Sequence, residues 1–111
     1  MQPLLSNQTS MNMKIKYQNE ELTLFTSTYA NNDALYVGLK DSDGEYYGDI
    51  TVNLPNSHTL PSDCAFVNEN NTPGIGRILT ETGVATPLFQ SARSGYCTYF
   101  AYRFNLELLN S

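Results

Sequence analysis

Residues 35–54 constrain the fold of this chain more than any other segment, because they hold two strand-like runs with a turn between them. Apolar side chains recur at every second position in Leu35–Leu39 and again in Ile50–Leu54, which is the period of a half-buried strand. The Asp-Ser-Asp-Gly sequence of residues 41–44 is typical of a turn. We therefore expect a β-hairpin here and an antiparallel arrangement around it.

The apolar residues also predict the register of this hairpin. A four-residue loop at 41–44 pairs Leu39 with Tyr46 and Leu35 with Ile50, so the apolar sets of both arms share one face. A three-residue loop would slip one arm by a residue and turn its side chains to the other face. The four-residue loop is therefore our prediction.

The rest of the chain predicts further strands. Residues 14–17 are expected to pair with the strand 21–26, and Cys64–Val67 to form a short buried strand. A second hairpin is expected from residues 88–93, turning at Ser94-Gly95 into a long strand over 96–108. Alternation in that long strand predicts one face that forms the main wall of the core: Tyr96, Thr98, Phe100, Tyr102, Phe104 and Leu106.

One short helix is expected over about 73–82. Thr72 suits its N-cap, Pro73 suits its first position, and Gly83 suits the residue just past its end. Ile75 and Leu79 would form its apolar stripe.

Length and composition fit one folded domain. The chain has 111 residues, of which 41% are hydrophobic, with eight tyrosines and five phenylalanines, and a chain of this size normally builds a single core. We predict an α+β domain over 13–111, with one twisted antiparallel sheet of about five to seven strands and one short helix. The polar stretch within residues 1–12 is expected to be a flexible leader.

The net charge of −5 argues against several classes of function. A nucleic-acid binder needs a basic footprint, and so does a protein that docks on anionic membranes. No run approaches the roughly 18 apolar residues of a membrane span, and the first residues do not resemble a secretory signal. With only two cysteines, Cys64 and Cys97, far apart in the sequence, we expect a cytoplasmic, reduced protein.

An acidic cluster at the central hairpin is the first candidate contact surface. Asp41, Asp43, Glu45 and Asp49 lie within nine residues, with Lys40 as the nearby cation. They do not follow the calcium-loop pattern, which has glycine at its sixth position where this chain has a tyrosine, so we expect no metal site. We predict that these carboxylates bind a protein partner.

Other chemical motifs are incomplete. Gly74-Ile75-Gly76 lacks the third glycine of a dinucleotide-binding loop, and His58, the single histidine, is expected to be exposed in a loop. No cofactor is therefore expected. A second candidate contact surface lies on the outward face of the last strand, where Tyr99 and Arg103 are interface-type residues that Arg93 would approach across the hairpin.

Several phrases of the chain together resemble a known family. They are Thr28-Tyr29-Ala30, Leu35–Leu39, Val52–Pro55, Ala65–Asn71, and Ser94–Cys97 running into Tyr102–Asn105. The family comprises short acidic proteins of unknown function from phages, plasmids and conjugative elements of bacteria. Some small proteins of this kind are anti-CRISPR inhibitors, so the resemblance implies such a role. It supplies no functional motif whose residues could be carried over.

The resemblance therefore implies a non-enzymatic binding protein that inhibits a CRISPR-type defence nuclease in the cytoplasm of a bacterial host cell. Its acidic residues would occupy the basic nucleic-acid channel of the nuclease, where opposite charge speeds and orients binding. Two alternatives belong to other classes: a small enzyme or ligand-binding domain with a pocket between sheet and helix, and a homodimeric structural domain joined through the aromatic strand. An enzyme would need a concave site with converging polar groups, whereas an inhibitor needs an exposed patch of one charge sign.

Overall fold

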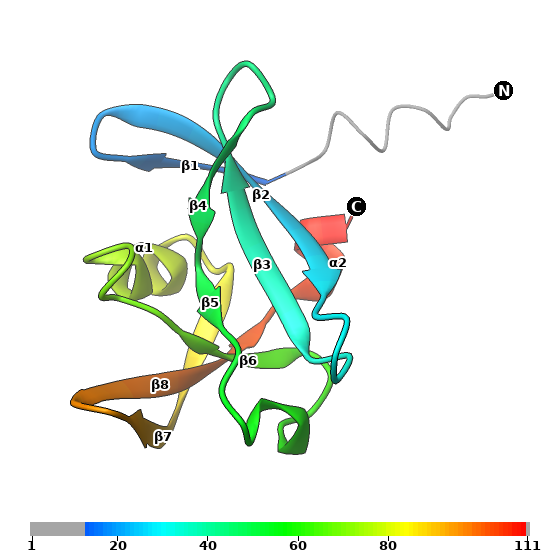
Figure 1. The fold of residues 1–111 in the computed structure, drawn as a ribbon. Helices are drawn as coiled ribbons and strands as arrows, with labels where there is room; N and C mark the ends of the chain where they lie inside the picture. The colour runs from blue at the N-terminus through cyan, green and yellow to red at the C-terminus, as the bar shows by residue number, and fades with distance from the viewer. Residues whose placement is uncertain (1–12, 111) are drawn as a thin grey trace, which may run out of the picture.

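In the computed structural model, which describes residues 13–110, the chain forms two four-stranded antiparallel sheets and two short helices (Figure 1). The first sheet has the strand order β1-β2-β3-β4 and the second β5-β6-β8-β7. The predicted leader, residues 1–12, lies outside the described part of the chain. The elements are β1 (Lys14–Tyr17), β2 (Glu20–Thr28), β3 (Leu35–Lys40), β4 (Tyr46–Asp49), β5 (Thr51–Val52), β6 (Cys64–Val67), α1 (Ile75–Glu81), β7 (Ala85–Ser94), β8 (Cys97–Phe104) and α2 (Leu106–Asn110).

The mixture of strands and short helices agrees with the predicted α+β class, but the prediction of a single sheet is wrong. The chain changes sheets at Ile50. Its N–H donates to the carbonyl of Val37 in the first sheet (2.9 Å), whereas its carbonyl accepts the N–H of Asn68, which follows the last strand residue of β6 (2.8 Å). One residue therefore ends the first sheet and begins the second.

At the point where the chain passes from one sheet to the other, the N–H of Val37 bonds to a side chain. The side-chain Oγ1 of Thr51 accepts it at 3.2 Å and shares a second hydrogen bond with the phenol of Tyr29 at 3.0 Å. Thr51 is buried, so its hydroxyl takes the place of a carbonyl from the sheet ladder. Residues 50–54 therefore do not continue the hairpin with β3 as predicted, because the chain leaves the first sheet after Ile50 and β5 belongs to the second.

The β1–β2 hairpin confirms the predicted pairing. Its turn residues Gln18 and Asn19 both have positive φ values, 49° and 67°, as a tight two-residue hairpin turn requires.

The β3–β4 hairpin also forms, but its register differs from the prediction. Tyr46 pairs with Lys40 rather than with Leu39, a difference of one residue, and Leu39 pairs with Gly48 rather than with Tyr46, a difference of two. Tyr47 is therefore the extra residue of a β-bulge, which the alternation of apolar residues does not reveal.

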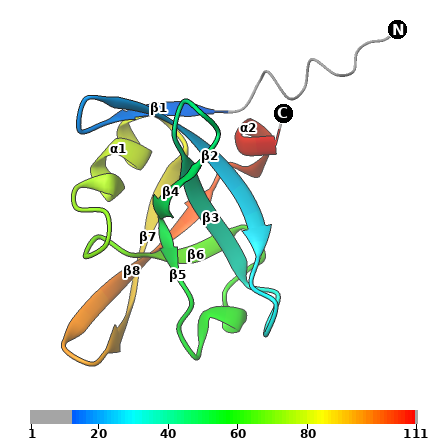
Figure 2. The ribbon, with the colours of Figure 1, turned by 45° about the horizontal axis from the view of Figure 1, so that its top comes forward.

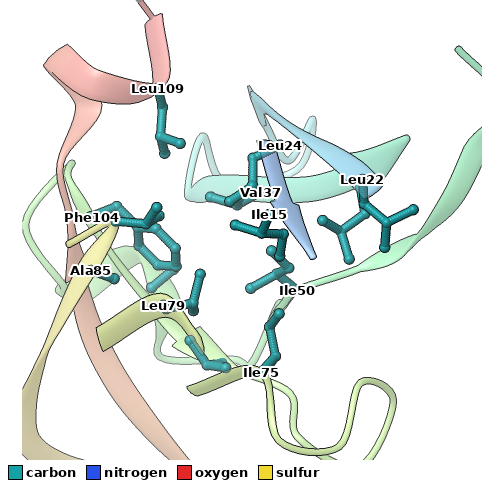
Figure 3. Packing of buried hydrophobic residues seen from close by; sticks show 14 of the residues in the cluster. Ile15, Leu22, Leu24, Val37, Ile50, Ile75, Leu79, Ala85, Phe104 and Leu109 are labelled. Atoms are coloured by element: carbon teal, nitrogen blue, oxygen red, sulfur yellow. The ribbon is translucent and has the colours of Figure 1, made fainter. Parts of the chain in front are cut away.

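The main core lies between the two sheets and is completed by both helices (Figure 3). Figure 3 shows Leu79 of α1 and Phe104 of β8 directed toward Val37 and Ile50. The cluster draws on nearly every element: Ile15, Tyr17, Leu22, Leu24, Leu35, Val37, Leu39, Ile50, Ala65, Val67, Ile75, Leu79, Val84, Ala85, Phe104 and Leu109.

The predicted core wall on the last strand is only partly correct. Phe104 is 2% exposed, but Phe100 is 54% exposed and Tyr96 is fully exposed. Figures 1 and 2 show the reason, because the β7–β8 hairpin extends well beyond the helix and strands that cover its base. Alternation predicted the face on which these side chains lie, but not where the covering layer ends.

The opposite face of β8 packs against a second, smaller cluster. Ala101 lies there against Phe66 and Leu54, all buried. Tyr99, predicted to face outward, is partly buried against this cluster.

The helices differ from the prediction in two respects: α1 begins later than expected, and a second short helix, α2, is present. Helix α1 begins at Ile75 rather than at 73, although it does end just before Gly83, whose φ is +77°. Leu106, expected on the last strand, instead begins α2, and the side chain of Asn105 accepts the N–H of Leu108 at 3.1 Å to cap it. Within residues 13–110, no helix is long and apolar enough to cross a membrane.

Candidate functional site

The acidic turn of the β3–β4 hairpin uses one of its carboxylates to hold its own shape. Oδ1 of Asp41 accepts the backbone N–H groups of Asp43 (2.9 Å) and Glu45 (3.0 Å). The carboxylates of Asp43 and Glu45 are exposed, and within the described residues neither takes part in a hydrogen bond or ion pair. These two are therefore the members of the cluster that are available to a partner.

Asp49, the fourth predicted carboxylate, is engaged by tyrosines. Its Oδ1 accepts the phenol of Tyr36 at 2.6 Å and the phenol of Tyr46 at 3.0 Å. Burial, followed by the hydrogen bond to Asp49 and its negative charge, raises the pKa of Tyr36 well above the ordinary tyrosine value. The same causes raise the pKa of Tyr46.

These contacts predict an alkaline transition. A folded-state pKa above the unfolded value means that the unfolded chain loses the Tyr36 proton first as the pH rises. The contribution to stability is therefore complete below about pH 10, the ordinary tyrosine pKa, and is lost progressively above it. Following tyrosine ring carbons by NMR against pH should show Tyr36 ionising late, and Asp49→Asn should bring its ionisation to lower pH. Asp43→Asn, which removes a carboxylate without a tyrosine contact, should leave it unchanged. A Tyr36 titration that Asp49→Asn does not move at all would contradict this account, because burial alone would then explain the late ionisation.

The second predicted surface is not a single patch. Arg103 forms an ion pair with Asp63 (Nε to Oδ2, 3.2 Å), and Tyr99 packs against the smaller cluster around Phe66. Arg93 is the cross-strand partner of Thr98, which places it on the other side of the hairpin from Tyr99. The structure therefore does not bring these three side chains together.

A well-fixed polar loop between β6 and α1 was not identified from the sequence. Oδ1 of Asn68 accepts the N–H groups of Asn70 (3.1 Å) and Asn71 (3.2 Å). The side chains of Asn71 and Thr72 both donate to the carbonyl of Asp49, at 3.0 and 2.9 Å. The loop is thus tied to the end of β4 by side-chain hydrogen bonds.

Glu69 in this loop holds the start of α1. Its Oε2 accepts the N–H of Gly76 at 3.0 Å and its Oε1 accepts the N–H of Gly74 at 3.4 Å. The Glu69 carboxylate therefore takes the N-capping role predicted for Thr72. An acidic group suits the positive end of a helix. Gly76 allows the close approach, because a Cβ there would collide with the Glu69 carboxylate and the Tyr102 phenol.

Two clefts lie on either side of this loop. The first, which we call the Phe100 cleft, has a volume of about 230 Å³ and is lined by Val67, Glu69, Asn70, Thr98, Phe100 and Tyr102. The second, the Tyr47 cleft, measures about 210 Å³ and lies between β1, β4 and residues 71–73. Tyr46 on its border is 63% exposed. We refer to the two clefts and the Asn68–Gly74 loop, which contributes residues to both, as the loop face.

The loop face combines fixed carboxylate and amide groups with exposed aromatic rings, which are the groups that recognise a partner by hydrogen bonding and stacking. The Asn-Glu-Asn-Asn run was the available sequence indication, but it was interpreted only as part of a family phrase. Phe100 was missed because its alternation assigned it to the core. Within residues 13–110, no group of three or more His, Cys, Asp or Glu side chains is placed to hold a metal ion.

In a comparison with protein families, the model described as "Domain of unknown function (DUF4313)" matches residues 23–111. No curated protein and no solved structure matches the chain. The family description names no activity, so the inhibitor role implied by the sequence resemblance stays a prediction.

Proposed function

Because the chain belongs to the DUF4313 family, a domain of unknown function, we propose a function from its geometry: it is a non-enzymatic module that binds a partner protein through the loop face. The observation that carries this proposal is the Asn68–Gly74 loop, which is fixed by its own hydrogen bonds and flanked by two clefts with exposed aromatic side chains.

Two physical arguments support a binding role for this surface. A loop that is already ordered loses little conformational entropy when it binds, so more of the contact energy remains as affinity. Exposed aromatic residues beside clefts are the usual energetic anchors of protein interfaces. Phe100 and Tyr46 have this character, since both border a cleft and both are more than half exposed.

Charge indicates the kind of partner. Of the residues that the structure describes, Glu69 is the one charged residue in the lining of the Phe100 cleft, and the carboxylates of Asp43 and Glu45 belong to the hairpin that carries Tyr46. On a chain of net charge −5 this arrangement favours a partner with a basic surface. The nucleic-acid channel of a host defence nuclease is such a surface, and it is the target that the sequence resemblance implies.

The alternative of a ligand pocket between sheet and helix has a structural counterpart in the Phe100 cleft. Its volume of about 230 Å³ is below the ~300–1,000 Å³ of sites that enclose a whole small molecule. A cleft of this size suits one side chain of a larger partner, which favours the binding module.

The proposal predicts which surface residues matter. We would capture partners from bacterial lysate with the full chain, identify them, and measure the affinity of each purified partner for variants. Tyr46→Ala combined with Phe100→Ala should weaken binding at least about tenfold, since an interface anchor is typically worth ~2 kcal/mol or more. Asp43→Asn with Glu45→Gln should slow association at low salt and have less effect at high salt.

The matched control is Phe89→Ala with Tyr96→Ala, which removes two aromatic side chains that are exposed but line neither cleft. This control should bind as the parent does. If the control loses binding while the loop-face variant keeps it, the contact surface lies on the part of the β7–β8 hairpin that carries Phe89 and Tyr96, and the proposal is wrong.

A further inference from the structure

The Phe100 cleft brings a carboxylate, an amide and an aromatic ring together at the rim of the core. Val67 and Phe100, which pair on neighbouring strands, line the cleft together with Glu69 and Asn70 of the loop. We propose that this cleft receives the side chain of an arginine from the partner protein. This inference rests on the proposed function and specifies its central contact.

The carboxylate of Glu69 is suitably fixed for this role. Its two hydrogen bonds to Gly74 and Gly76 hold the side chain in place, so binding would not have to order it. A carboxylate offers about four acceptor positions on two oxygens. The two bonds to the helix therefore leave acceptor capacity for the planar, two-pronged donors of a guanidinium group.

The aromatic residues supply the second half of the recognition. A guanidinium group stacks on the face of an aromatic ring, and the attraction is greater where the ring is sheltered from water. Phe100 is half exposed at the cleft, while Tyr102 is partly buried and packs against the main core. Burial, and after it the negative charge of Glu69, raises the pKa of Tyr102, and the second of these causes agrees with a negative potential at this position.

The charged residues around the cleft are compatible with an incoming cation. Arg93 is the cross-strand partner of Thr98 and so lies on the face of the hairpin that carries Phe100, but it does not line the cleft. Arg77 of α1 is engaged with Glu81 at 2.9 Å. The cation would bind beside Glu69, the charged residue in the lining of the cleft.

The test is an NMR titration of the full, isotopically labelled chain with N-acetyl-arginine methylamide. The matched probe is N-acetyl-citrulline methylamide, which has nearly the same shape and no charge. We expect the arginine probe to shift the amide signals of Gly76, Asn70 and Phe100, and the citrulline probe to leave them in place. Added salt should weaken the arginine effect.

Two variants examine the two halves of the site. Glu69→Gln removes the charge but keeps an oxygen that can accept an N–H of the helix, and Phe100→Ala removes the ring. Each should weaken binding of the arginine probe about tenfold, whereas Phe89→Ala, outside the cleft, should have no effect. Melting curves of the Glu69→Gln variant separate lost binding from a loosened helix.

Three outcomes would overturn the inference: equal shifts with citrulline, no shift at tens of millimolar arginine probe, or arginine binding that survives both variants. Signals that shift with protein concentration alone and revert in Phe100→Ala would show that a second copy of the chain occupies the cleft instead. The proposed function is tested by a separate experiment. Loss of partner affinity in the variant that combines Tyr46→Ala with Phe100→Ala would support it even if the arginine probe does not bind.

Discussion

Phe104→Ala should lower the free energy of unfolding by about 3–5 kcal/mol, the cost of emptying a large aromatic site in a core. Phe104 is 2% exposed and packs in the main cluster between the two sheets and α1. A loss of this size is a large share of the ~5–15 kcal/mol expected for a small domain. Urea denaturation followed by far-ultraviolet circular dichroism would measure it.

Phe100→Ala is the matched comparison, because it makes the same change on the same face of β8, four residues away. Phe100 is more than half exposed, so we expect a loss of about 1 kcal/mol or less. The pair therefore measures where the covered part of the β7–β8 hairpin ends. Equal losses for the two variants would mean that Phe100 is buried in solution and that the Phe100 cleft is closed.

Thr51→Val should cost about 2–4 kcal/mol, although valine has nearly the same shape and suits a strand. The substitution leaves the buried N–H of Val37 without its acceptor, which costs ~1–3 kcal/mol, and removes the hydroxyl partner of Tyr29, worth ~0.5–1.5 kcal/mol. Denaturation measures the total. Hydrogen exchange at the Val37 amide measures the local effect, and we expect that amide to exchange faster relative to its neighbours in β3.

The control for this prediction is Thr23→Val in β2, where no hydrogen bond of the side chain is present within the described residues. That change should remain within about 0.5 kcal/mol of the parent. If Thr51→Val is equally mild, a water molecule or a shifted backbone satisfies Val37, and the hydroxyl does not hold the sheet crossing.

The sequence predicted the geometry of the acidic turn because local residues decide it, while the role of its carboxylates in binding a partner stays a prediction. An Asp-Ser-Asp-Gly sequence forms a turn in almost any context, and Asp43 and Glu45 are exposed there as expected. The clefts could not be predicted, because each is lined by residues from different elements. Phe100 and Glu69 come together only after β6 and β8 pair, and Tyr46 lies beside residues 71–73 only because the Asn68–Gly74 loop is tied to β4.

The sequence by itself determined most of the strands, the first hairpin turn, the end of α1, and the face of β8 on which each side chain lies. These features depend on neighbours within a few residues: alternation, turn formers, and a glycine past a helix. The tertiary structure alone decided the division into two sheets and the burial of each face. At Ile50 the alternation continues unbroken, yet the carbonyl bonds to Asn68 and the chain leaves the first sheet. Which partner a carbonyl finds, and how far one layer covers another, depends on segments distant in the sequence, so only the packed fold decides it.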